Sequence, residues 1–222
     1  MSIPMIAGLY SYVRGGVASM ADVTLKEIPQ SIEINPLYKK ALYVLAGNQE
    51  SAAQLAGFNL NVYRIFDDAP EYVQQNMAHM MKHWMCLWAL KEFGEFLWVD
   101  WDTVMLQFPD KAFTDMCRKN RTPKFIRIPN YWATVNCGVY YACHEWISAM
   151  ESSFKVKVDP PNDELLWAEV LPADVLDREE FWLDDYAVHI GSKRDIGAVT
   201  DKTYFAHVKN LEWAEQLRNI QK

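Results

Sequence analysis

The chain has 222 residues, half of them hydrophobic, and a formal net charge of −7. A chain of this length buries one good-sized core, and its acidic balance excludes the overall basic field that usually marks nucleic-acid-binding proteins. The apolar stretch at residues 3–12 is broken by Pro4 and Gly8, and no run of about 18 apolar residues occurs, so we expect neither a secretory signal nor a membrane span.

Cysteine spacing indicates free thiols. None of the four cysteines forms a C-x₂-C pair: Cys86, Cys117, Cys137 and Cys143. Because free thiols persist in reducing compartments, we expect a soluble cytoplasmic protein.

Strand-like and helix-like segments alternate in the first half of the chain. The patterns predict strands at residues 5–13, 42–45, 61–66 and 96–99, and helices at residues 49–56 and 71–93. Apolar residues recur near the 3.6-residue period in the second helix, which Gly94 ends. This alternation predicts an α/β fold with a mainly parallel central sheet flanked by helices.

Beyond residue 110 the pattern is less regular. It predicts strands at residues 124–128 and 138–142, and helices at residues 145–154, 163–169 and 211–220. No repeat, low-complexity tract or linker interrupts the chain, so we expect a single domain over residues 1–222.

The triplet Asp100-Trp101-Asp102 follows the apolar strand predicted at residues 96–99. Fifteen aspartates give about one Asp-x-Asp triplet by chance, so the motif alone is weak, and a polar turn is the alternative interpretation. However, ligands bind at the carboxyl ends of strands in open α/β sheets. Two carboxylates at that position favour Mn²⁺ or Mg²⁺, which in turn binds phosphate oxygens.

Residues 96–104, FLWVDWDTV, resemble the D-x-D segment of GT-A-fold (Rossmann-like) glycosyltransferases. Three later segments fall in that family's order: Asn136-Cys137-Gly138-Val139, Asp163-Glu164 and His207-Val208-Lys209. The resemblance implies a metal held by Asp100, Asp102 and His207 that bridges the diphosphate of a nucleotide sugar. It also implies that Asn136 and Gly138 line the sugar and acceptor pocket, and that Lys209 contacts the diphosphate.

Besides Asp100 and Trp101 of the triplet, four further residues are candidates for nucleotide-sugar binding. Tyr10, Tyr12 and Arg14 end the first predicted strand, where a tyrosine stacks on uracil or packs in the core and Arg14 meets a phosphate. Lys82 on the long predicted helix either reaches the diphosphate or is a solvated lysine.

Asp163 and Glu164 are the candidate catalytic acids. They follow two prolines at the start of a predicted helix, so helix capping is the alternative interpretation. An inverting transferase needs a carboxylate that takes the proton of the acceptor hydroxyl, and the sequence leaves open which residue supplies it.

The remaining charged residues receive simpler interpretations. We expect the other four histidines, His79, His83, His144 and His189, to be packing or surface residues. The one dense basic cluster flanks the acceptor side, either as a solvated turn or as a contact for a polyanionic acceptor: Arg118, Lys119, Arg121, Lys124 and Arg127.

The sequence therefore predicts a metal-dependent glycosyltransferase, either a hexosyl- or a pentosyltransferase, with UDP-sugar as the expected donor. Residues 1–110 would bind the donor and residues 111–222 the acceptor, which is a carbohydrate, a protein, a small molecule or DNA carrying a hydroxylated base. Two alternatives remain. One is a nucleotidyltransferase of similar fold, although Arg14-Gly15-Gly16 matches the phosphate loop of that class poorly. The other is a non-catalytic binding domain.

Overall fold

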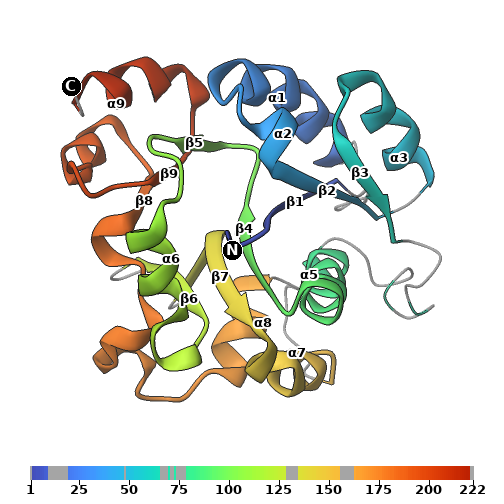
Figure 1. The fold of residues 1–222 in the computed structure, drawn as a ribbon, viewed down its shortest axis with the longest axis vertical. Helices are drawn as coiled ribbons and strands as arrows, with labels where there is room; N and C mark the ends of the chain where they lie inside the picture. The colour runs from blue at the N-terminus through green and yellow to red at the C-terminus, as the bar shows by residue number, and fades with distance from the viewer. Residues whose placement is uncertain are drawn as a thin grey trace.

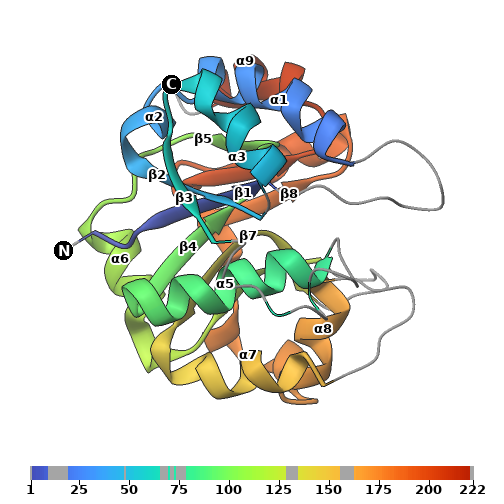
Figure 2. The ribbon, with the colours of Figure 1, turned by 90° about the vertical axis from the view of Figure 1, so that its right-hand side faces the viewer.

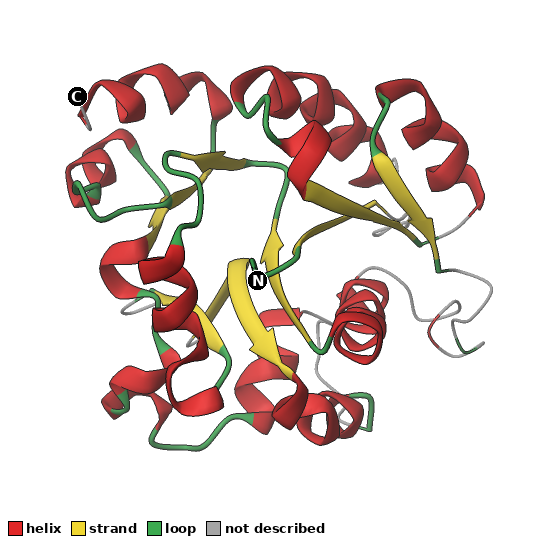
Figure 3. Cartoon of the chain, in the orientation of Figure 1, coloured by secondary structure: helices red, strands yellow, loops and turns green. Residues whose placement is uncertain are grey.

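A computed structural model describes residues 2–9, 20–47, 49–65, 70, 73, 79–128, 135–155 and 163–220. Helices and strands alternate through the first half of the chain (Figures 1 and 3). The strands are β1 (Met5–Leu9), β2 (Leu42–Ala46), β3 (Asn61–Arg64), β4 (Glu95–Val99), β5 (Thr103–Met105), β6 (Lys124–Arg127), β7 (Val135–Cys143), β8 (Ala187–Ile190) and β9 (Phe205–Val208). The α-helices are α1 (Met20–Ile34), α2 (Tyr38–Ala41), α3 (Gln49–Leu55), α5 (His79–Phe93), α6 (Lys111–Arg118), α7 (Ile147–Ser153), α8 (Asp163–Val170) and α9 (Ala214–Ile220).

The main sheet has six strands in the order β3-β2-β1-β4-β7-β6. The first four run parallel, whereas β7 is antiparallel to both β4 and β6. The predicted α/β fold with a mainly parallel sheet is therefore confirmed. The change of direction at β7 brings the carboxyl end of β4 beside the amino-terminal half of β7, where Val99 pairs with Val139.

Helices cover both faces of the main sheet (Figure 2). In β4 the side chains alternate: Phe96 and Trp98 pack with α5, α7 and α8, whereas Leu97 and Val99 pack on the opposite face with α1, α2, α3 and α6. This period of two explains why the whole strand is apolar, since both of its faces are buried.

A smaller sheet of three strands, in the order β5-β9-β8, extends from the end of β4. β5 begins directly after the Asp-Trp-Asp triplet and is antiparallel to β9, with Thr103 opposite His207. Asn35 and Tyr38 both donate hydrogen bonds to the carbonyl oxygen of Thr103, at 2.9 and 3.2 Å. The segment between α1 and α2 thereby fixes the start of β5.

Most predicted elements lie where the structure has them, and the bounds that can be compared differ by a few residues. Residues 10–13 of the first predicted strand, residue 66 of the third, and residues 71, 72 and 74–78 of the long predicted helix lie outside the described residues. The sequence patterns missed α1, α2, β5, α6, β8 and β9. The four cysteines are free, as expected, and all four are buried. Among the described helices, none is long and apolar enough to cross a membrane.

Candidate metal centre

A tight turn joins β4 to β5 and presents the Asp-Trp-Asp triplet. The backbone N–H of Asp100 donates to the carbonyl of Gly138 at 2.8 Å, and the N–H of Thr103 donates to the carbonyl of Asp100 at 3.1 Å. Between them the indole of Trp101 is buried and donates to the carbonyl of Gly8 at 3.0 Å. Hydrogen bonds to β1 and β7 thus hold the turn in place at the end of β4.

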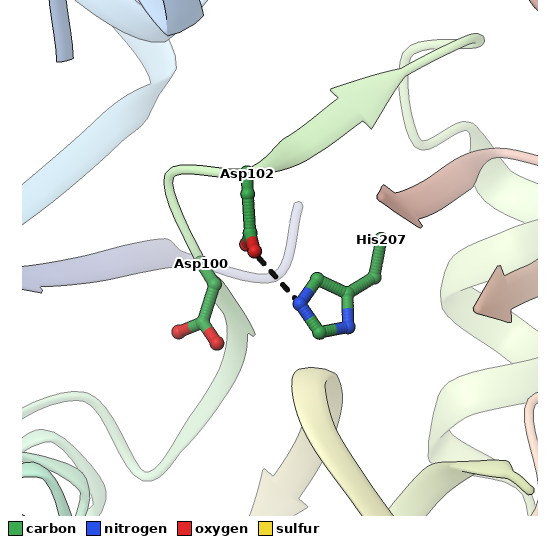
Figure 4. Close-up of side chains that lie close together, drawn as sticks. All are labelled: Asp100, Asp102 and His207. Atoms are coloured by element: carbon green, nitrogen blue, oxygen red, sulfur yellow. Dashed lines mark ion pairs between the residues drawn. The ribbon is translucent and has the colours of Figure 1, made fainter. Parts of the chain in front are cut away.

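Asp102 points toward His207, and Asp100 lies beside this pair (Figure 4). Asp100, Asp102 and His207 each offer one ligand atom, and these atoms all lie within 4.8 Å of one another. Nε2 of His207 lies 3.1 Å from Oδ1 of Asp102. The three residues proposed as ligands from the sequence therefore lie close together, and their binding of a cation stays a prediction.

Asp100 is held by two side chains from the α5 face of the sheet. Its carboxylate accepts from the indole of Trp98 at 2.6 Å, and the ammonium of Lys82 lies 3.1 Å away. Lys82 also donates to the carbonyl of Cys137 at 2.9 Å and is buried, so the interpretation as a solvated helix lysine is wrong. Burial raises the pKa of Asp100 above its usual range, although the positive charge of Lys82 opposes that shift.

Asp102 and His207 form a charge-assisted pair. Burial alone would raise the pKa of Asp102, but the attraction of His207 and their hydrogen bond outweigh it and hold that pKa below its usual value. Burial would likewise lower the pKa of His207, whereas Asp102 raises it above the ordinary value. The pair therefore favours an imidazolium beside a carboxylate when no cation is bound.

The other ring nitrogen of His207 is held from β7 and β8. Nδ1 lies 2.8 Å from Oδ1 of Asn136 and 3.1 Å from Nδ1 of His189. A Cβ atom placed on Gly138 would lie 2.2 Å from the same Nδ1, so the imidazole rests directly on a strand position that has no side chain. His189 was expected to be a packing or surface histidine; it instead contacts His207, because β8 and β9 pair with these two residues in register.

One further acid faces the centre and was not singled out from the sequence. Glu27 on α1 is partly buried, and burial together with the charges of Asp102 and Asp100 raises its pKa to about 7. No local motif marks this residue, since α1 lies far from the triplet in the chain. Glu27 can be recognised as a residue of the site only in the folded structure, where α1 lies over the end of β4.

The remaining predicted site residues lie at different distances from the cluster. Glu164 on α8 accepts a hydrogen bond from Nδ2 of Asn136 at 2.8 Å, and Lys209 follows His207 at an exposed position. Asp163 begins α8. Tyr10, Tyr12 and Arg14 lie outside the described residues.

The basic cluster predicted on the acceptor side is divided among internal partners. Arg118 pairs with Glu95 at 2.5 Å and Arg121 with Glu145 at 2.7 Å. Arg127 stacks on Trp182 and Lys124 is buried, whereas Lys119 is exposed. The five charges therefore do not form one open basic surface.

The other histidines agree with the sequence interpretation in two cases. His83 is buried between the rings of Phe154 and Trp167, each 5.6 Å away, and His144 is exposed. His79 begins the described part of α5.

The donor set fits a divalent cation. Two carboxylates and one imidazole suit Mn²⁺, and carboxylates also suit Mg²⁺. Three protein ligands leave further coordination positions for oxygens of a phosphate group. The outer nitrogen of His207 is bonded to Asn136, the arrangement that orients a ligating histidine in metalloproteins.

The sheet order, the helices on both faces and the acidic turn after β4 define a GT-A-like fold. No protein-family model and no curated protein matches the sequence. Among solved structures, the chain is similar to a glycosyltransferase involved in the glycosylation of the major capsid of PBCV-1, with a TM-score of 0.53 and 14% sequence identity over 99% of this chain and 100% of that chain.

It is also similar to the glycosyltransferase GlyE of Streptococcus pneumoniae TIGR4, with a TM-score of 0.52 and 13% identity. That match covers 98% of this chain and 60% of GlyE, so the chain spans less than two thirds of GlyE. At these identities the two likenesses establish the fold.

Proposed function

We propose that the protein is a metal-dependent glycosyltransferase that moves a sugar from a nucleoside-diphosphate sugar, with UDP as the expected nucleotide, to a hydroxyl acceptor. The observation that carries the proposal is the cluster of Asp100, Asp102 and His207 at the carboxyl end of β4 in a GT-A-like fold. The two solved structures named above are glycosyltransferases, which supports the same class of reaction here.

Asp100, Asp102 and His207 would hold the cation, which when bound supplies positive charge to a diphosphate. Lys82 adds a fixed positive charge 3.1 Å from Asp100, and Lys209, exposed two residues after His207, adds a second. Positive groups set in place before reaction stabilise the negative charge of a departing nucleoside diphosphate. We assign donor binding to residues 1–110, with Tyr10, Tyr12 and Arg14 at the nucleoside.

Residues 111–222 would bind the acceptor. Of the two candidate acids, Glu164 is the one whose side chain the structure describes, and the amide of Asn136 fixes one of its oxygens. A carboxylate so placed can take the proton of an acceptor hydroxyl in an inverting reaction. Asp163 is the second candidate, and both stereochemical outcomes remain compatible with this fold.

The acceptor would be a carbohydrate, a protein or a small molecule bearing a hydroxyl group. DNA with a hydroxylated base is the sharpest variant, and it would require the base to leave the stack. The basic residues close together in the sequence suggested a surface that binds DNA. In the structure Arg118 and Arg121 form ion pairs within the protein, which weakens the case for a DNA acceptor. The free, buried cysteines fit a cytoplasmic enzyme.

Calorimetric titration of UDP with and without Mn²⁺ tests the proposal. We expect Mn²⁺ to strengthen UDP binding at least about tenfold, and Asp102→Ala to abolish that gain. Asp115→Ala, which removes an exposed aspartate from α6, is the matched control and should keep it.

Binding of UDP that ignores Mn²⁺, or that survives Asp102→Ala unchanged, would refute the metal-bridged donor site. A screen of nucleotide sugars for donor hydrolysis then identifies the sugar, and an acceptor screen that includes modified DNA follows. Metal-loaded, folded protein without turnover of any donor would instead favour a binding domain, and release of pyrophosphate from nucleoside triphosphates would favour a nucleotidyltransferase.

A further inference from the structure

The side-chain amide of Asn136 makes three hydrogen bonds, which together fix its orientation. Oδ1 lies 3.1 Å from the backbone nitrogen of Gly138 and 2.8 Å from Nδ1 of His207, while Nδ2 lies 2.8 Å from Oε1 of Glu164. A backbone N–H only donates and an ionised carboxylate only accepts. Both of these partners therefore require the same orientation of the amide.

This orientation determines which nitrogen of His207 is left for a cation. The amide oxygen of Asn136 cannot donate, so Nδ1 of His207 must donate to it. In the metal-free protein Nε2 also donates, to the carboxylate of Asp102 at 3.1 Å, and the ring is the imidazolium described above. A cation that takes the place of the Nε2 proton leaves the single N–H of the neutral ring on Nδ1.

His189 is the other described group that contacts Nδ1 of His207, and it cannot impose this choice. Its own Nδ1, 3.1 Å away, either donates or accepts according to its tautomer, so it adapts to His207. Asn136, in contrast, is anchored by the backbone of β7 and by α8, and its side chain is 5% exposed. Only the amide therefore has a single allowed arrangement.

We propose that Asn136 is a positioning residue that selects the Nε2-ligating tautomer of His207 and ties Glu164 to the same point. The inference rests on the proposed metal site. A histidine whose outer N–H is bonded to a fixed acceptor is held in one orientation and is a more basic ligand. One amide thus connects the ligand from β9 with the carboxylate from α8.

Two variants separate this role from simple packing. Asn136→Leu removes the acceptor, whereas the exchange Asn136→Asp with Glu164→Gln keeps both the net charge and the hydrogen-bonding pattern. In the exchanged pair the new carboxylate accepts from Gly138, His207 and the amide at position 164.

Two measurements are made on each protein: the tautomer of His207 by ¹⁵N NMR of the chain loaded with diamagnetic Mg²⁺, and the affinity for Mn²⁺ by the EPR signal of the free ion. We expect the Nδ1–H form in the wild type and in the exchanged pair, with Mn²⁺ affinities within about threefold of each other. In Asn136→Leu we expect mixed tautomers and an affinity about 10- to 100-fold weaker. Asn219→Leu, at an exposed position on α9, controls for the loss of an asparagine.

An Nε2–H tautomer in the wild type overturns the inference without any variant, as does an Asn136→Leu protein that binds Mn²⁺ as tightly as the wild type. If Asn136→Leu does not fold, Asn136→Ser, whose hydroxyl stops one atom short of His207, takes its place. Wild-type protein that does not bind Mn²⁺ overturns the metal site itself and this inference with it, so the two failures are distinguishable.

Discussion

Gly138→Ala should damage the metal centre by displacing His207. The added methyl group would lie 2.2 Å from Nδ1, 2.3 Å from Cε1 and 2.4 Å from Cγ of that ring. Ordinary contacts begin near 3.4 Å, so the imidazole must move by about 1 Å. Metal–ligand distances tolerate only about 0.2 Å, and we therefore expect Mn²⁺ to lose His207 as a ligand.

We expect the affinity of Gly138→Ala for Mn²⁺ to fall at least about 30-fold, or about 2 kcal/mol, close to the loss caused by His207→Ala. Overpacking should also lower the free energy of unfolding by about 1–3 kcal/mol. Gly57→Ala is the matched control because nothing lies within 4 Å of its added methyl group. Mn²⁺ affinity in Gly138→Ala equal to that of Gly57→Ala would show that His207 does not bind the cation from its observed position.

Three further perturbations test the charges and the scaffold of the centre. Because the pKa of His207 is raised, protons should compete with Mn²⁺ as the pH falls through that pKa. Calorimetry in buffers of different ionisation enthalpy should record about one proton released for each Mn²⁺ ion bound. An affinity for Mn²⁺ that stays constant between about pH 5 and 8 contradicts this expectation. The pKa of Glu27 rises from 4.5 in the unfolded chain to about 7, so the native state binds more protons and stability falls as the pH rises through that window. Glu27→Gln should therefore stabilise the metal-free chain by about 1 kcal/mol at pH 8 and by much less at pH 4 in urea unfolding, whereas an equal gain at both pH values would refute the charge argument. Trp101→Phe removes the hydrogen bond to the carbonyl of Gly8 and should cost about 1–3 kcal/mol of unfolding free energy. A change below about 0.5 kcal/mol would show that this bond is dispensable.

The strand β4 and the two aspartates that follow it could be predicted from the sequence, because short local patterns mark them. Residues 96–99 are apolar without alternation, as expected for a strand buried on both faces, and Asp100 and Asp102 follow it directly. The order of the later motifs also placed His207 with the acidic pair. These features depend on short stretches of chain, each with its own pattern.

The missed helix and strands have weak local patterns, and the missed site residues depend on contacts between distant segments. α1 contains Pro29 and several β-branched residues, which weaken a helical pattern. β5, β8 and β9 have only three or four residues, too few for a period of two to be distinctive. The roles of His189 and Glu27 follow from the β8–β9 register and from the position of α1, neither of which has a local signature.

The proposed ligands lie on both sheets: Asp100 follows the main sheet, whereas His207 belongs to the small one. A bound cation would therefore act as a cross-link between the two sheets, and a ligand that binds only the folded state raises the melting temperature in proportion to the logarithm of its concentration. Thermal-shift plates of metal salts and nucleotide sugars would then rank donors before any acceptor is known.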